Sequence, residues 1–305
     1  MYRLFNRFSL RFLGLGIAFF LYFRLDLSST WGYLSNSDLS LFLATIACVN
    51  LVVLLQAWRG YILLDYERGK LKFSEYAKLY FVTMAASATL PGRVGVVAQV
   101  PLMHRHGVSL RSGIANMLYD KLCDLAGFLA MSALFGLMVV KNMAISPAAL
   151  MTMSFITLLV LWYMDIFFEI ATKYTKHFFS NKYLESDQSS VRLRLNTKIY
   201  ALFLTLLRLG GAIVVHLFAA SSAGLHEPFS YVAAASSFGA LSTFLPVSML
   251  GVGLREGLFL LIFAGRGLPE EQIMTFAVIV LLGYLSTVIL GTIVAMADRK
   301  KELPS

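Results

Sequence analysis

The chain has 305 residues, of which 58% are hydrophobic and 14% are charged, and its mean hydropathy is +0.72. Soluble domains carry about 25% charged residues and about half apolar ones, so this composition excludes an ordinary soluble protein. The net charge of +9 could indicate nucleic-acid binding, but membrane proteins also collect Lys and Arg in cytoplasmic loops, and long apolar runs favour that explanation. We therefore expect an all-α, polytopic protein with one membrane domain and no nucleic-acid partner.

Six apolar runs predict spanning helices, and the loops between them differ greatly in charge. The runs lie at about residues 12–27, 39–58, 118–140, 147–170, 199–223 and 273–297. The first resembles a signal peptide, but no clear small-residue cleavage site follows it, so we expect an uncleaved helix. Basic residues cluster before the first run, within 59–78, within 173–198 and after the last run.

Two further apolar stretches, residues 79–102 and 231–264, are interrupted by proline, glycine and charge. If the first crossed the membrane once, the largest basic loop would lie outside, against the positive-inside rule. Two re-entrant hairpins, one entered from the cytoplasm and one from outside, place every basic loop and both termini in the cytoplasm. A pair of full spans in place of either hairpin gives the same parity, so that alternative stays open.

The predicted layout contains a repeat. Each half reads as a span, an interrupted hairpin, a short polar connector and another span, and the connectors are HGVSLRSGI and RGLPEEQI. Because the two hairpins enter from opposite sides, the halves form an inverted repeat, which places a binding site near the midplane. The single membrane domain, 1–305, then divides into five parts. These are an N-terminal helix and loop (1–38), a first repeat (39–141), a connecting helix with the basic loop (142–198), a second repeat (199–297) and a cytoplasmic tail (298–305).

The turn of the second hairpin is the strongest candidate for anion binding. Pro246 ends the incoming limb, and Gly251 and Gly253 permit an unusual backbone. The first turn of the outgoing limb, expected to start near residue 254, offers free N–H groups, and Arg255 adds planar donors suited to phosphate. Glu256 would receive a proton or balance an arginine; alternatively it only caps the limb while Arg255 extends to the interface.

Two more arginines are candidates for binding the same phosphate. Arg93 lies among Pro91, Gly92 and Gly95, which we expect to form the first hairpin's turn, and it is otherwise an interfacial arginine. Arg208 lies about nine residues into its span, roughly 14 Å deep at 1.5 Å per residue. Since an arginine at the bilayer centre costs about 2.5–3.5 kcal/mol, we expect Arg208 to face the interior and contribute to headgroup binding.

Three charged residues, Asp120, Lys121 and Asp124, are expected to begin the helix after the first hairpin. Lys121 and Asp124 stand at i,i+3 and can pair, so we expect a structural role. We expect Cys48 and Cys123 to be small core residues that form neither a disulfide nor a metal site. No recognised catalytic motif is present, and we expect no cofactor and no metal.

At these residues the chain resembles the lysylphosphatidylglycerol synthase transmembrane domain family, also described as flippase-like membrane proteins. LPVSMLGVGLREG is similar to that family's late Pro-Ile-Ser-x-x-Gly-x-Gly-x-Arg-Glu signature. LPGRVG followed by HGVSLRSGIANMLYDKLCDL resembles the earlier signature, with Asp120 and Lys121 where Glu and Arg are common. Leu250 stands where many members have a small residue, and the first hairpin lacks the usual acidic residue after its glycines.

The resemblance implies a lipid-handling protein of the plasma (inner) membrane. In multi-domain members a soluble C-terminal domain attaches an amino acid from charged tRNA to phosphatidylglycerol; this chain ends soon after its last helix, so we expect a stand-alone member without that activity. The expected function is a flippase or transporter for an anionic phospholipid or a polyprenyl-phosphate-linked substrate, with envelope or glycolipid assembly enzymes as possible partners. The alternatives are an intramembrane transferase with Glu256 or an aspartate as general base, and a non-transporting subunit of an assembly complex.

Overall fold

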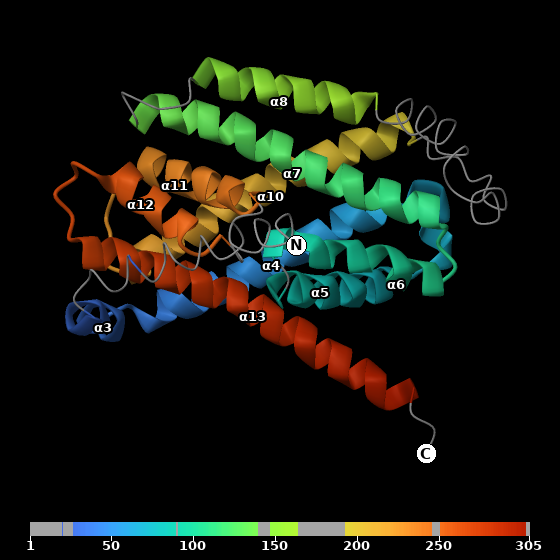
Figure 1. The fold of residues 1–305 in the computed structure, drawn as a ribbon, viewed down its shortest axis with the longest axis horizontal. Helices are drawn as coiled ribbons and strands as arrows, with labels where there is room; N and C mark the ends of the chain where they lie inside the picture. The colour runs from blue at the N-terminus through green and yellow to red at the C-terminus, as the bar shows by residue number, and fades with distance from the viewer. Residues whose placement is uncertain are drawn as a thin grey trace, which may run out of the picture.

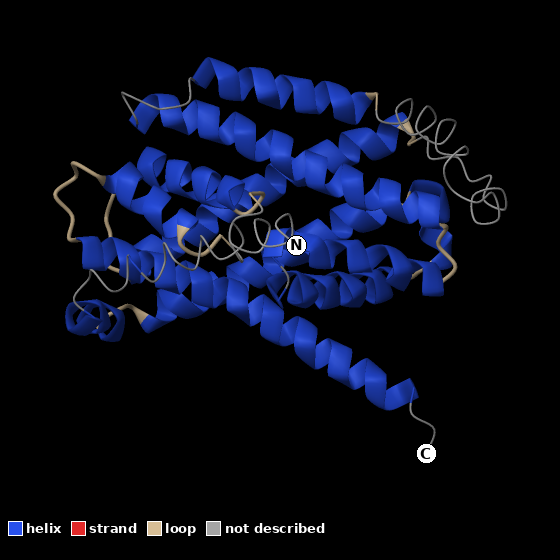
Figure 2. Cartoon of the chain, in the orientation of Figure 1, coloured by secondary structure: helices blue, strands red, loops and turns tan. Residues whose placement is uncertain are grey.

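The computed structural model describes residues 20, 27–89, 91–139, 147–163, 193–245 and 251–302, and these ranges contain helices and no strand (Figure 2). The expected all-α membrane fold is confirmed, because four helices in these ranges are long and apolar enough to cross a bilayer. They are α4 (Leu39–Leu63), α7 (Leu110–Val139), α10 (Leu195–Ser222) and α13 (Glu270–Glu302), the last over Glu270–Ala297.

The two other predicted spans are only partly described. α8 (Pro147–Trp162) occupies the start of the fourth predicted span, and residues 164–170 lie outside the described ranges. The first predicted span also lies outside them, apart from Phe20 and Leu27. Leu27 begins the short helix α3 (Leu27–Ser35), which packs against α13.

α4 and α10 pack antiparallel at the centre of the bundle. At one end, which we call the Asp38 end, the Ser222 hydroxyl donates to the Asp38 carbonyl at 2.9 Å. At the other, the Asp65 end, the Arg194 N–H donates to the Asp65 carboxylate at 2.8 Å. Asp38 also caps α4, and its hydrogen bonds from the Ser40 hydroxyl and from backbone N–H groups hold its pKa below the usual range.

The segment after α4 folds back on itself at the Asp65 end. It contains the 3₁₀ turn η1 (Asp65–Lys70), α5 (Phe73–Thr89), the 3₁₀ segment η2 (Pro91–Ala98) and α6 (Gln99–Arg105). η2 and α6 pack against α5, and Figure 1 shows α5 and α6 side by side on the right. Glu67 accepts from the Ser109 N–H at 2.8 Å, so the chain enters and leaves this segment at one end of the bundle.

A second folded-back pair occupies the Asp38 end. It consists of α11 (Phe229–Ser242) and α12 (Leu254–Phe263), which lie on the left of Figure 1. The outer ends of the two helices meet, with Tyr231 and Phe263 stacked at 6.3 Å between ring centroids. α12 begins at residue 254, as the sequence predicted. The two pairs therefore start at opposite ends of the bundle.

Two helix boundaries differ from the sequence prediction because buried charges allow the helices to continue. Arg59 was placed in a basic loop, but α4 runs on to Leu63 and the Arg59 side chain is 0% exposed. α7 begins at Leu110, so Asp120 lies well inside the helix rather than at its start. Each helix tolerates its charge because the other supplies the partner.

Gly95 provides a direct test of the first folded-back pair. A Cβ atom there would overlap backbone atoms of Ala86 and Ser87 on α5. We expect Gly95→Ala to destabilise the protein by about 1–3 kcal/mol, the usual range for overpacking. Gly257→Ala is the matched control, because nothing lies within 4 Å of its added Cβ and alanine favours a helix. Thermal unfolding in detergent measures both; equal midpoints would show that η2 does not pack this tightly.

Candidate functional site

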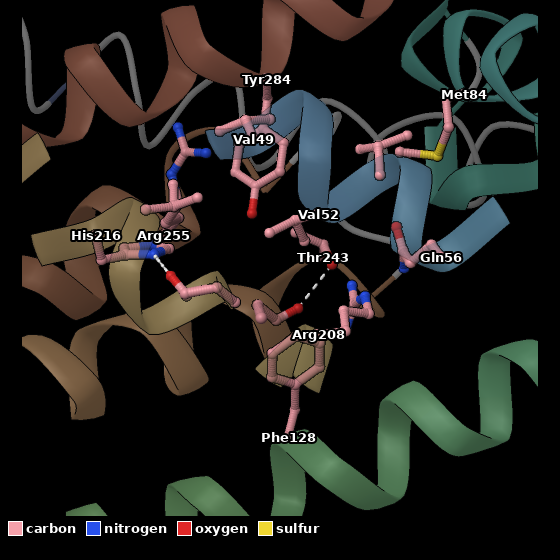
Figure 3. A pocket seen from close by; sticks show the side chains of 15 residues that line it. Val49, Val52, Gln56, Met84, Phe128, Arg208, His216, Thr243, Arg255 and Tyr284 are labelled. Atoms are coloured by element: carbon pink, nitrogen blue, oxygen red, sulfur yellow. Dashed lines mark hydrogen bonds between the residues drawn. The ribbon is translucent and has the colours of Figure 1, made fainter. Parts of the chain in front are cut away.

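A small enclosed cavity lies at the centre of the bundle, where α4, α10, α11, α12 and α13 meet (Figure 3). Its volume of about 30 Å³ holds about two water molecules at 10–15 Å³ each. Its lining includes Val49, Val52, Gln56, Arg208, His216, Gly239, Thr243, Arg255 and Tyr284. The cavity thus combines an apolar wall with a few polar side chains from both halves of the chain.

Arg208 and Arg255 line this one cavity, although they lie 47 positions apart in the sequence. Figure 3 shows them on opposite sides of the space, with the Tyr284 hydroxyl pointing between them. Both are nearly buried, with 8% and 2% of the residue exposed. The sequence predicted an interior position for Arg208 and left an interfacial position open for Arg255, and the fold brings both to one cavity.

Both arginines keep N–H groups without a hydrogen-bond partner among the described residues. These are Nε of Arg255 and both Nε and Nη1 of Arg208. Arg208 Nη1 lies 3.1 Å from Asp124 Oδ1, an ion-pair distance whose geometry does not make a hydrogen bond. An unsatisfied buried donor costs about 1–3 kcal/mol, and more when charged, so an anion in the cavity would be strongly stabilised.

Glu256 forms hydrogen bonds with part of the turn that the sequence analysis predicted to bind phosphate. Gly251 and Gly253 have φ angles of 81° and 87°, which favour glycine. The Gly253 N–H donates to the Glu256 carboxylate, and Arg255 Nη2 donates to Glu256 Oε1 at 2.7 Å. Glu256 therefore both caps α12 and balances Arg255. Arg255 does not extend to the interface, because it is buried beside this carboxylate.

A buried charge network extends from the cavity toward the Asp65 end. Arg59 Nη2 donates to Asp120 Oδ1 and to Asp124 Oδ1, each at 2.6 Å. Lys121 Nζ lies 2.8 Å from Asp120 Oδ2, so Lys121 pairs with Asp120 and not, as the spacing suggested, with Asp124. Asp124 faces Arg59 and Arg208 instead. The network thus reaches the cavity through Arg208.

Hydrogen bonds tie the same network to neighbouring helices. Tyr80 of α5 donates to Asp120 Oδ2 at 3.1 Å, and Gln56 of α4 donates to Asp124 Oδ2 at 2.9 Å. Arg59 Nη1 donates to the Thr205 hydroxyl of α10 at 3.0 Å. The two aspartates of α7 therefore connect this helix to α4 and α5, and the Arg59 guanidinium connects α4 to α10.

Among the described residues, the buried charges of the network and the cavity balance one another. The three cations are Arg59, Arg208 and Arg255, and the three carboxylates are Asp120, Asp124 and Glu256; Lys121, which pairs with Asp120, has a side chain that is 21% exposed. Buried charge is costly unless it is paired. An anion that enters the cavity would therefore have to displace one of these carboxylates from its arginine.

Several of the predicted site residues are not among the described residues that line the cavity. Pro246 and the side chains of Pro91 and Arg93 lie outside the described residues, although the backbone of Pro91, Gly92 and Arg93 belongs to η2. Gly95 is a packing position against α5.

Sequence reasoning missed His216 and Arg59. The His216 Nδ1 lies 2.8 Å from the Ala212 carbonyl, so this nitrogen carries the proton, and the buried Nε2 has no hydrogen-bond partner in the part of the chain that the structure describes. His216 follows Arg208 by eight residues, close to two helical turns, and this spacing could have revealed it. Among the described residues, no group of three His, Cys, Asp or Glu side chains could hold a metal ion.

Comparison with known proteins agrees with the helical membrane architecture. None of the curated proteins compared with the chain matches it. A family model described as the lysylphosphatidylglycerol synthase TM region matches residues 9–291, which include all the charged residues of the network and the cavity. Because this match covers nearly the whole chain, the protein belongs to the family of lysylphosphatidylglycerol synthase transmembrane regions.

Proposed function

We propose that this protein is a flippase or transporter for an anionic phospholipid or a polyprenyl-phosphate-linked substrate. The phosphate binds in the central cavity between Arg208 and Arg255, and the lipid tails stay in the bilayer. One observation carries the proposal: one cavity inside a membrane domain is lined by two nearly buried arginines, each with N–H groups that lack a hydrogen-bond partner among the described residues. Ionisable residues at membrane depth usually mark substrate pathways.

In the proposed topology the protein lies in the plasma (inner) membrane, and both of its termini are in the cytoplasm. The Asp65 end faces the cytoplasm, because Arg68, Lys70 and Lys72 lie there. The α5–α6 pair is a re-entrant hairpin from that side, and the α11–α12 pair is one from the opposite side. The two halves then form an inverted repeat, an arrangement that gives transporters a midplane site.

Glu256 acts as an internal counter-ion in this mechanism. Without substrate it neutralises Arg255 and accepts the Gly253 N–H. A phosphate would compete for the same donors, so its arrival would release Glu256. Because the present cavity of about 30 Å³ is too small for a headgroup, loading requires the α11–α12 pair to move relative to α4 and α10.

The charge of the site favours a phosphodiester headgroup. A phosphodiester carries one negative charge, as does the Glu256 carboxylate that it would displace from Arg255, whereas a phosphomonoester carries about −1.5 to −2 at neutral pH. Phosphatidylglycerol is therefore a suitable test lipid.

Leaflet exchange of labelled phosphatidylglycerol in reconstituted vesicles tests the proposal. The wild-type protein is expected to exceed protein-free vesicles. Arg208→Gln should slow exchange by about tenfold or more, because a hydrogen bond to a charged group contributes about 1.5–3 kcal/mol. Asp124 keeps Arg59 and Gln56 as partners in this variant, so the fold is retained.

Arg105→Gln is the matched control, since this exposed arginine is the last residue of α6 and does not line the cavity. It should exchange lipid at the wild-type rate. Equal exchange in wild-type and protein-free vesicles would rule out transport, and covalently altered lipid would favour a transferase.

A further inference from the structure

His216 places an imidazole ring in the wall of the central cavity, on the same side as Arg255 (Figure 3). The residue is 2% exposed, and its ring packs edge-on against Phe259 of α12 and Phe276 of α13, with centroid distances of 6.0 Å and 5.9 Å. Because Nδ1 keeps its proton for the Ala212 carbonyl, Nε2 carries a lone pair, and no described residue donates to it. This nitrogen can therefore accept a proton without breaking any described contact.

The cavity surrounds this imidazole with few charged or titratable groups. α12 contributes Arg255, which is paired with Glu256; α10 itself contributes Arg208, which faces Asp124; and α13 contributes Tyr284. The described lining residues of α4, α5, α7 and α11 carry no titratable group. A further cation among these aromatic rings and arginines is costly unless an anion accompanies it, so without an anion the imidazole is neutral.

The balance of buried charge means that an anion needs a cation to accompany it. Among the described residues, three buried arginines already match three buried carboxylates. A phosphodiester that takes the place of Glu256 at Arg255 adds one negative charge, because the displaced carboxylate stays in the protein, and one proton restores the balance. Among the described lining residues, histidine is the side chain that takes up a proton between about pH 5 and pH 8, since arginine is always protonated and tyrosine loses its proton only near about pH 10.

We infer that His216 is a proton-binding site and that one proton binds and crosses the membrane together with each anionic substrate. This inference rests on the proposed function and adds the coupling ion to it. On loading, Nε2 takes one proton from the aqueous solution, Nδ1 keeps its own, and the imidazolium supplies the positive charge that the anion requires. Because linkage is reciprocal, the proton strengthens anion binding by the same factor as the anion strengthens proton binding.

Proton uptake during lipid binding tests this inference. The full chain in detergent is titrated near neutral pH with short-chain phosphatidylglycerol in two buffers of different ionisation enthalpy, and the difference in binding heat gives the number of protons taken up per lipid. We expect about one proton per phosphatidylglycerol, and an affinity that falls about tenfold for each pH unit above neutrality, because the bound state holds one proton more than the free state. Short-chain phosphatidylcholine, which has no net charge, is the control lipid and should cause no proton uptake.

His216→Gln should remove both the proton uptake and the dependence of affinity on pH. His226→Gln is the matched control, since it makes the same change at an exposed histidine that does not line the cavity, and it should keep both.

The wild-type measurement decides even where His216→Gln does not fold. Phosphatidylglycerol binding without proton uptake would overturn this inference alone, whereas the absence of any binding would overturn the proposed function as well. Proton uptake that persists in His216→Gln would also overturn the inference, and its loss in Glu256→Gln would assign the proton to the displaced carboxylate instead.

Discussion

A protein carrying both Arg255→Gln and Glu256→Gln is expected to fold normally and to lose lipid exchange. The double change removes a buried cation together with its counter-ion, so it leaves no unpaired charge at the start of α12. The glutamine at position 256 can still accept the Gly253 N–H through its side-chain carbonyl. We expect exchange of phosphatidylglycerol to fall by about tenfold to a hundredfold, because a charged donor to the phosphate is lost.

The single variants separate charge balance from lipid binding. Arg255→Gln leaves Glu256 buried with the Gly253 N–H but without a cation, and Glu256→Gln leaves Arg255 without its counter-ion. Removal of one partner of a buried pair costs about 3–5 kcal/mol, so each single variant should unfold at a lower temperature than the double variant. Wild-type exchange by a folded double variant would refute a role for Arg255 in binding.

Arg59→Met is expected to be among the most destabilising changes in the described core. Arg59 bonds to Asp120, Asp124 and Thr205 and is 0% exposed. Its loss should lower stability by about 3–5 kcal/mol, the range for breaking a buried ion pair. Thermal unfolding in detergent, followed by helical circular dichroism, measures the change.

A second substitution identifies the cause of that loss. Arg59→Met combined with Asp120→Asn should recover part of the stability, because the asparagine carries no charge that requires a partner. Asp120→Asn in the wild-type background is the control for the asparagine itself. If the double variant is as unstable as the sum of the single ones, the ion pair does not hold α4 against α7.

Local signals made much of the fold predictable. Hydropathy identified the four long apolar helices, and Gly251 and Gly253 marked the turn before α12, because positive φ angles favour glycine. The cost of burying an arginine in lipid correctly placed Arg208 in the interior. These features depend on short stretches of sequence, which is why they could be read without an alignment.

The pairing of charges could not be predicted in the same way. Arg59 stands at the edge of an apolar run. At such a position the sequence does not distinguish an arginine in a loop from a buried arginine that pairs with a carboxylate. Its contact with Asp120 spans 61 residues and depends on how α4 packs against α7. Likewise, Lys121 and Asp124 have suitable spacing for a pair, but packing turns Asp124 toward Arg59 and Arg208.

The most direct test of the central claim is a structure of the protein in lipid nanodiscs that contain phosphatidylglycerol. We expect an enlarged central cavity with phosphate density between the guanidinium groups of Arg208 and Arg255, and Glu256 moved away from Arg255. A cavity that stays closed at saturating phosphatidylglycerol, with both arginines still facing Asp124 and Glu256 and phosphate density only at the periphery, would contradict the account.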